Sequence, residues 1–233
     1  LFHQGTITKD GSKMSKSKGN TVSPDLFVDK YGSDTFRCYL MFMGPFDEGG
    51  DWNDKGITGI YRFLNRSISL CSNVKEYQLS VNDEYIIHHT IQSITNDLKK
   101  LKFNTSLSKL MEFVNHFFSK GISNKVAFIY IRLLAPFAPH IAEELREKLN
   151  CKESIFSEKW PTFDVKKIQK NIVNLGIQVN GKLRGSLDVD ISSDKNDILT
   201  QAKDHNNVKK YLNNKNIVKE IYVPNKIINF VVK

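Results

Sequence analysis

Three lysines fall within six residues near the start of the chain, among small hydroxyl and glycine residues. Residues 13–20 read KMSKSKGN, and Asp10-Gly11 precedes them. Lysine ammonium groups are mobile point charges that suit a triphosphate, and a loop of serine and glycine can close over such a group without steric cost. The composition of this loop predicts a phosphate clamp, although most exposed lysine-rich loops bind nothing.

The exact residues favour the clamp, because the stretch resembles the KMSKS loop of class I aminoacyl-tRNA synthetases together with the Lys-Gly-Asn that usually follows it. Further segments are similar to leucyl-tRNA synthetases of the bacterial type, in the order loop flank, helical anticodon-binding domain and C-terminal domain. These segments are YGSDTFR at 31–37, MFMGP at 41–45, GIYRFLNR at 59–66, KFNT at 102–105, LMEFVN at 110–115, LAPFAPHIAEEL at 134–145, QVNGKLRG at 178–185 and IYVPNKIIN at 221–229. The last two favour the leucine type over the valine and isoleucine enzymes, which are the close rivals.

The resemblance implies ATP-dependent activation of leucine and its transfer to tRNA(Leu), with Mg²⁺ accompanying ATP although no metal ligand is visible in the sequence. It implies catalytic roles for Lys16 and Lys13, with Met14 as a packing anchor of the loop. The ATP-binding residues would be Lys13, Met14, Ser15, Lys16 and Ser17.

The other half of a class I active site, a His-x-Gly-His type motif, is not present around any of the six histidines. We therefore expect the chain to be the C-terminal part of a synthetase and to be inactive alone. Its partner would be an N-terminal catalytic half, as a preceding part of the same polypeptide or as a separate chain. The rival hypothesis from another class is a stand-alone tRNA-binding module without catalysis.

The hydrophobic pattern predicts a mixed, multidomain fold in three parts. Residues 1–50 would be the end of a class I α/β catalytic domain, with a strand at 6–8 and helices starting near Pro24 and Ser33. Residues 51–160 carry apolar positions three and four apart, which indicates an α-helical bundle of the anticodon-binding type. Residues 169–233 alternate with period two around an Asn-Gly turn and predict a small α+β domain, joined by a linker near 160–168.

The charge is concentrated in the last part of the chain. Of the formal net charge of +9, residues 166–233 contribute +7, from 13 basic and 6 acidic side chains. Such a patch suits RNA phosphates, and the resemblance implies contact with the outer corner of tRNA. The candidate tRNA-binding residues are Lys182, Arg184, Lys209 and Lys210. For any single lysine, a role in solubility is the alternative.

Three isolated cysteines, Cys38, Cys71 and Cys151, have no spacing typical of disulfides, zinc sites or redox motifs. A reducing, cytoplasmic location is therefore expected, and no metal site. No stretch is apolar and long enough to predict a membrane span. The histidines at 88, 89 and 116 lack metal-ligand spacing, which favours helix-surface or satisfied core positions.

Overall fold

The computed structural model describes residues 1–76, 78–168, 172–190, 193–213 and 215–233. The chain divides into two compact units, Leu1–Ile168 and Gln169–Lys233. Each unit has its own cluster of buried apolar side chains. The boundaries predicted at residues 50 and 160 stay predictions. Residues on both sides of position 50 belong to one core.

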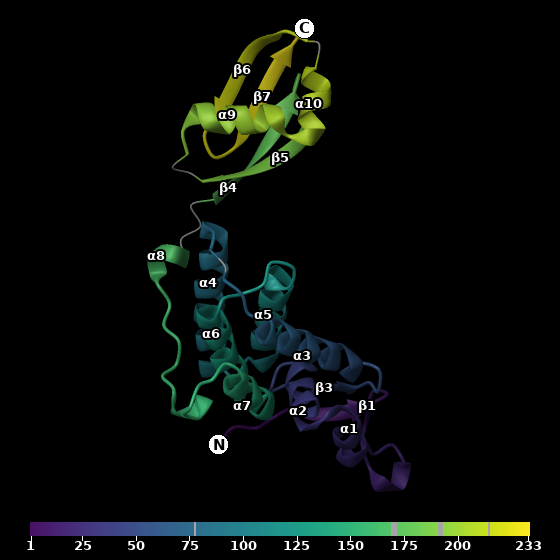
Figure 1. Ribbon diagram of the computed structural model, residues 1–233. Helices are drawn as coiled ribbons and strands as arrows, with labels where there is room; N and C mark the ends of the chain where they lie inside the picture. Colours follow the sequence, from purple (N-terminus) through teal and green to yellow (C-terminus); the bar gives the residue numbers. More distant parts are fainter. Residues whose placement is uncertain (77, 169–171, 191–192, 214) are drawn as a thin grey trace. The chain divides into compact units, whose positions relative to one another are not determined.

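The first unit begins with a small sheet and two helices (Figure 1). These elements are β1 (Thr6–Lys9), β2 (Ser12–Lys13), the 3₁₀ turn η1 (Lys16–Lys18), α1 (Pro24–Tyr31), α2 (Ser33–Phe42) and β3 (Gly49–Trp52). The strand order is β2-β1-β3, with β1 antiparallel to β2 and parallel to β3. The strand predicted at 6–8 and the two helix starts are confirmed, and Pro24 occupies the first turn of α1.

Helices make up the rest of the first unit (Figure 1). They are α3 (Ile57–Ser72), α4 (Val81–Lys99), α5 (Phe103–Phe117), α6 (Asn124–Leu134), α7 (Pro139–Lys148), the 3₁₀ turn η2 (Ile155–Ser157) and α8 (Val165–Ile168). The apolar stripes of α4, α5 and α6 are buried, as the spacing predicts. Leu101 continues the apolar spacing of α4 in the sequence, but it lies past the end of this helix, at a positive φ of 54°.

A buried carboxylate ties α2 to the start of α7. Asp34 is 4% exposed, and its two oxygens accept hydrogen bonds of 2.8 Å from the Ile141 backbone N–H and from His140 Nδ1. Asp34 therefore caps a helix that lies more than 100 residues away in the sequence. Its own helix, α2, has Gly32 as its N-cap residue and no side-chain cap. Such a carboxylate also suits the positive end of the helix dipole.

The segment predicted to be a linker, near 160–168, packs on the helices of the first unit. The Trp160 indole N–H donates to Thr95 Oγ1 at 2.8 Å, and the Asp164 N–H donates to His88 Nδ1 at 3.1 Å. Lys167 pairs with Glu84 at 2.6 Å. The sequence shows the proline and polar residues here but not these long-range partners.

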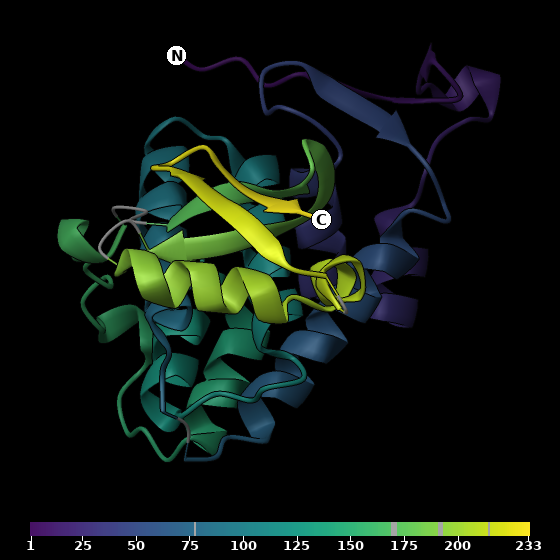
Figure 2. The same cartoon turned by 90° about the horizontal axis from the view of Figure 1, so that it is seen from above.

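The second unit is a four-stranded sheet with two helices on one face (Figures 1 and 2). Its elements are β4 (Ile172–Val179), β5 (Lys182–Asp190), α9 (Lys195–Asp204), α10 (Asn206–Leu212), β6 (Ile217–Val223) and β7 (Ile227–Val232). The strand order is β5-β4-β7-β6, with a parallel pair in the centre. Asn180 and Gly181 both have positive φ, which the predicted Asn-Gly turn requires.

One prediction about β5 is wrong. The period-two alternation of a strand predicts that Leu183, Leu187, Val189 and Ile191 share one face, yet Leu183 is 67% exposed while Val189 is buried. The cause is a β-bulge: Gln178 pairs with Leu183 and Ile177 with Gly185, which leaves Arg184 as the extra residue. The bulge reverses the alternation, and Leu183 faces solvent. Ile191 lies outside the described residues.

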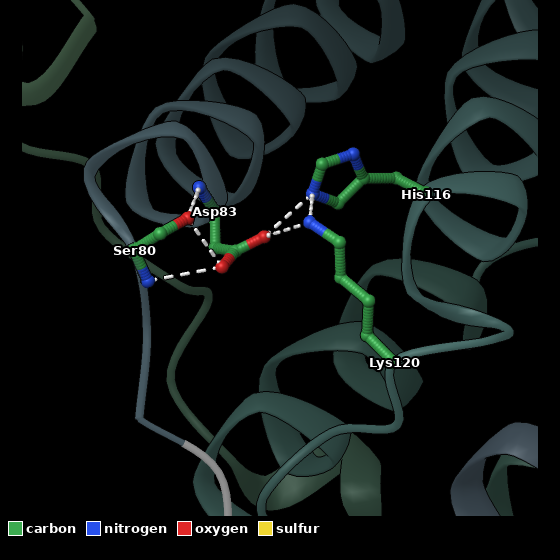
Figure 3. A network of polar contacts seen from close by, with 4 residues as sticks. All are labelled: Ser80, Asp83, His116 and Lys120. Atoms are coloured by element: carbon green, nitrogen blue, oxygen red, sulfur yellow. Dashed lines mark hydrogen bonds and ion pairs between the residues drawn. The ribbon is translucent and has the colours of Figure 1, made fainter.

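A fully buried carboxylate joins α4 to the end of α5 (Figure 3). The Asp83 side chain is 0% exposed and forms a capping box with Ser80, whose backbone N–H donates to Asp83 Oδ2 at 2.9 Å. The other oxygen accepts from His116 Nε2 at 2.6 Å and from Lys120 Nζ at 2.9 Å. His116 is therefore a satisfied core histidine, one of the two roles predicted for it.

Electrostatics favour the ionised form of Asp83. Burial raises the pKa of this carboxyl, but the hydrogen bonds from Ser80, Lys120 and His116 outweigh burial and hold the pKa well below its usual range. Because the pKa of Asp83 is lower in the folded state, the ionised carboxylate stabilises the fold at pH values above its unfolded-state pKa of about 3.9. This stabilisation is lost progressively as the pH falls below that value.

Replacing Asp83→Asn should lower the free energy of unfolding at pH 7 by about 3 kcal/mol, because it removes the charge of a buried carboxylate that accepts hydrogen bonds from Ser80, His116 and Lys120. Urea unfolding measures the loss. Glu112→Gln, in an exposed pair with Lys109, is the matched control and should cost under about 1 kcal/mol. The gap between wild type and Asp83→Asn should shrink below pH 4; a gap independent of pH would contradict the assigned charge.

Candidate functional site

Residues 13–20, here called the lysine loop, have an ordered backbone. The loop leaves a β1–β2 hairpin whose turn residues Asp10 and Gly11 both have positive φ, at 52° and 69°. Ser15 caps η1, since its Oγ accepts from the Lys18 N–H at 3.3 Å, and Gly19 ends the turn at a φ of 65°. Serine and glycine thus build a defined turn in this loop.

Two side chains outside the predicted set hold this loop. Asn20 Oδ1 accepts from the Ser15 N–H at 2.8 Å, and Asn20 Nδ2 donates to the Lys13 carbonyl at 3.2 Å. Asp51, on β3, accepts from Thr8 Oγ1 at 2.6 Å and from the Gly11 N–H at 2.9 Å. Both bonds lower the pKa of Asp51. The sequence contains a signal only for Asn20, which stands inside the loop motif.

The cationic groups of the loop point into solvent. Lys13, Lys16 and Lys18 are exposed, and within the described part of the chain none has an ion-pair partner inside 4.0 Å. The hydroxyls of Ser15 and Ser17 lie 3.0 Å apart. Met14 is half-buried against the core of the first unit, which agrees with the anchoring role predicted for it. The loop thus presents three positive charges to an anionic ligand.

A cavity of about 630 Å³ opens beside β1 in the first unit. Its walls come from the start of β1, the end of α2 and the segment leading to β3, and include Gly5, Ile7, Met41, Met43 and Phe46. Arg37 is the one charged residue in its lining within the described part of the chain. The lining is otherwise apolar or uncharged and offers no group for acid–base chemistry.

Two of the four basic residues predicted to bind tRNA, Arg184 and Lys210, lie against the same aromatic ring of the second unit. The guanidinium of Arg184 lies 4.0 Å over the ring of Tyr211, and Lys210 Nζ lies 5.5 Å from the same ring. Arg184 Nε is buried and has no hydrogen-bond partner in the described part of the chain. Lys182 is exposed, whereas Lys209 pairs with Asp204 at 3.6 Å. Sequence reasoning missed Tyr211, because the bulge that brings Arg184 to it has no sequence signature.

Among the described residues, no three histidine, cysteine or acidic side chains gather as metal ligands would. Cys38 and Cys71 are buried. Burial raises the pKa of both thiols to about 12, with the charge of Asp34 adding to the effect at Cys38. Neither thiol is a nucleophile in this state. In the described ranges, no helix is long and apolar enough to span a membrane.

Comparisons with known proteins match two segments of the chain to tRNA ligases. Residues 1–51 match the model "tRNA synthetases class I (I, L, M and V)", and residues 85–199 match "Anticodon-binding domain of tRNA ligase". Leucine–tRNA ligases of Clostridium tetani (strain Massachusetts / E88) and Clostridium botulinum (strain Langeland) are 42% and 40% identical over 255 residues, which cover 100% of this chain.

The chain belongs to the leucyl-tRNA ligase family. It corresponds to the C-terminal portion of this class I enzyme and spans 31% of the length of these curated relatives. The family resemblance in the sequence is confirmed: the end of the class I catalytic domain is followed by the anticodon-binding helical domain of the leucyl-tRNA ligases.

A solved member of the leucyl-tRNA ligase family has the same fold over this portion. It is the LeuRS of Agrobacterium radiobacter K84, described as a ternary complex with tRNA and LeuAMS. It is 30% identical, has a TM-score of 0.66, and is matched over 100% of this chain and 33% of its own.

The cysteines should differ sharply in reactivity. At pH 8 a disulfide reagent such as DTNB should modify the half-exposed Cys151 at least about a hundredfold faster than Cys38 or Cys71, whose thiolates are scarce and enclosed. Absorbance at 412 nm, with peptide mapping, measures the rates, and denaturant should make all three equal. Rapid labelling of Cys38 in the folded chain would contradict the packing described for α2.

Proposed function

We propose that this chain supplies the ATP-clamping loop and the tRNA-binding surfaces of a leucine–tRNA ligase. The complete enzyme would activate leucine with ATP and then transfer it to tRNA(Leu). The observation that carries this proposal is the lysine loop: three exposed, unneutralised ammonium groups on a backbone with defined hydrogen bonds, in a chain whose relatives are leucine–tRNA ligases.

In this proposal Lys16 and Lys13 are catalytic and stabilise negative charge that grows on the phosphates of ATP as pyrophosphate departs. The ATP-binding residues are Lys13, Met14, Ser15, Lys16 and Ser17. Ser15 would act through its cap and backbone, and Met14 through its anchorage. ATP would arrive with Mg²⁺, and the described residues offer no cluster of metal ligands of their own.

Catalysis would also require the portion of the relatives that this chain does not span. The proposed partner is an N-terminal catalytic half, with the enzyme working in the cytoplasm. tRNA would be held by the helical domain and by Lys182, Arg184, Lys209 and Lys210 of the second unit. A tRNA-binding module without catalysis is the second candidate, favoured by the concentration of positive charge in residues 166–233.

Mixing this chain with the N-terminal part of the Clostridium tetani leucine–tRNA ligase, truncated where its match to this chain begins, should give leucine-dependent ATP–pyrophosphate exchange. Neither part alone should show it. Lys16→Ala should lower the exchange rate of the mixture about a hundredfold, by analogy with other preorganised donors to developing charge.

Lys55→Ala is the matched control for this assay, since Lys55 is exposed outside the loop and should leave the rate unchanged. Equal rates for wild type and Lys16→Ala would contradict the catalytic role of the loop. Failure of the wild-type mixture to exchange, with tRNA binding intact, would favour the binding module.

Lys182→Ala and Arg184→Ala should each weaken binding of tRNA(Leu) about fivefold at 0.15 M salt, as expected for loss of one phosphate contact, and should reduce the salt dependence accordingly. Lys209→Ala should have a smaller effect, because Asp204 already neutralises Lys209 in part. Filter binding across a salt series measures both quantities. Lys219→Ala, on β6 at the opposite edge of the sheet, is the control; an equal effect there would show that the charge acts non-specifically.

A further inference from the structure

Asn20 is the one side chain in the described structure that bonds to the lysine loop on both sides of Met14. Its carboxamide oxygen accepts from the Ser15 N–H at 2.8 Å, and its amide nitrogen donates to the Lys13 carbonyl at 3.2 Å. A single planar group therefore fixes the backbone both before and after the anchored methionine.

The chemistry of this bridge requires asparagine. The group must accept one backbone N–H and donate to one backbone C=O at the same time, which a carboxamide does and a carboxylate cannot. Glutamine has the same two functions but one more methylene, so its amide would lie farther from the backbone it must reach. Asn20 is half-buried, and both of its contacts join residues of the same loop.

The bridge lies between the two lysines proposed to be catalytic. Lys13 precedes the fixed segment, and Lys16 begins η1 one residue after Ser15. Like charges in so short a loop repel one another, and the glycine and serines around them allow many backbone conformations. Without a cross-link, the ammonium groups would spread over many positions and would seldom lie together over one phosphate chain.

We infer that Asn20 is a positioning residue for the proposed ATP reaction, one that acts by holding the backbone of Lys13 and Lys16 in the phosphate-binding arrangement. This role rests on the proposed function. Asn20 itself does not touch the reacting atoms. It reduces the motion of the groups that would, which is how preorganisation lowers a barrier.

The geometry can be tested on the whole chain alone by hydrogen exchange. In Asn20→Ala, the Ser15 amide should exchange at least about tenfold faster than in wild type, while the melting temperature stays within about 2 °C. Asn65→Ala is the matched control, because its side-chain amide donates to the Tyr61 carbonyl at 2.8 Å within α3. Unchanged exchange at Ser15 would overturn the bridge.

The catalytic consequence can be tested by a double-mutant cycle in the complemented exchange assay. Asn20→Ala should lower kcat about tenfold and leave the KM for leucine unchanged. In a background that lacks both positioned ammonium groups, Lys13→Ala with Lys16→Ala, the same change should cost under about twofold, because a positioning residue has no effect once the groups it positions are gone. Asn20→Asp, which keeps the acceptor but loses the donor, should match or exceed the loss of Asn20→Ala.

The outcomes separate this inference from the proposed function. If the wild-type mixture catalyses ATP–pyrophosphate exchange and Asn20→Ala does not slow it, the positioning role alone is overturned. A loss from Asn20→Ala that multiplies independently with the loss from the Lys13→Ala, Lys16→Ala pair would also overturn it, since Asn20 would then act elsewhere. No exchange by the wild-type mixture would overturn the proposed function and the positioning role together.

Discussion

Mutual repulsion between three ammonium groups within six residues is the constraint around which the start of this chain is built. A flexible loop would relieve that repulsion by spreading, so the backbone has to be held by contacts that the lysine side chains do not make. The structure provides them at each level: Ser15 caps the turn, Asn20 bridges it, and Asp51 holds the hairpin beneath it. Asp51 lies on β3, whose last residue is Trp52. Trp52 is buried in the core that also contains side chains of α3.

The regular elements were predictable because their causes are local. Periodicity of three and four gave the buried faces of α4, α5 and α6, and the Asn-Gly pair gave the β4–β5 turn. Contacts between residues distant in the sequence were not predictable. The capping of α7 by Asp34, the packing of Trp160 on Thr95 and the pairing of Asp51 with Thr8 each join residues more than 40 positions apart.

The candidate sites divide in the same way. The lysines were visible as a motif, whereas the groups that hold them became visible only with the backbone in place. In the second unit, the β-bulge at Arg184 explains two results: the wrong prediction for the face of Leu183 and the unpredicted contact with Tyr211. It turns Leu183 to solvent, and it places Arg184 where its guanidinium stacks on Tyr211. A planar guanidinium on an aromatic ring keeps its outer edge available for a phosphate while its stem is covered.

The pairing of Asp51 with the β1–β2 hairpin also limits how freely the loop can be moved between proteins. A graft of residues 6–20 onto another scaffold would carry the lysines, the serine cap and the asparagine bridge, but it would leave behind the carboxylate that receives Thr8 and Gly11. The smallest transferable module therefore runs from β1 through β3. In evolution, the same dependence favours inheritance of residues 6–52 as one block rather than exchange of the short motif alone.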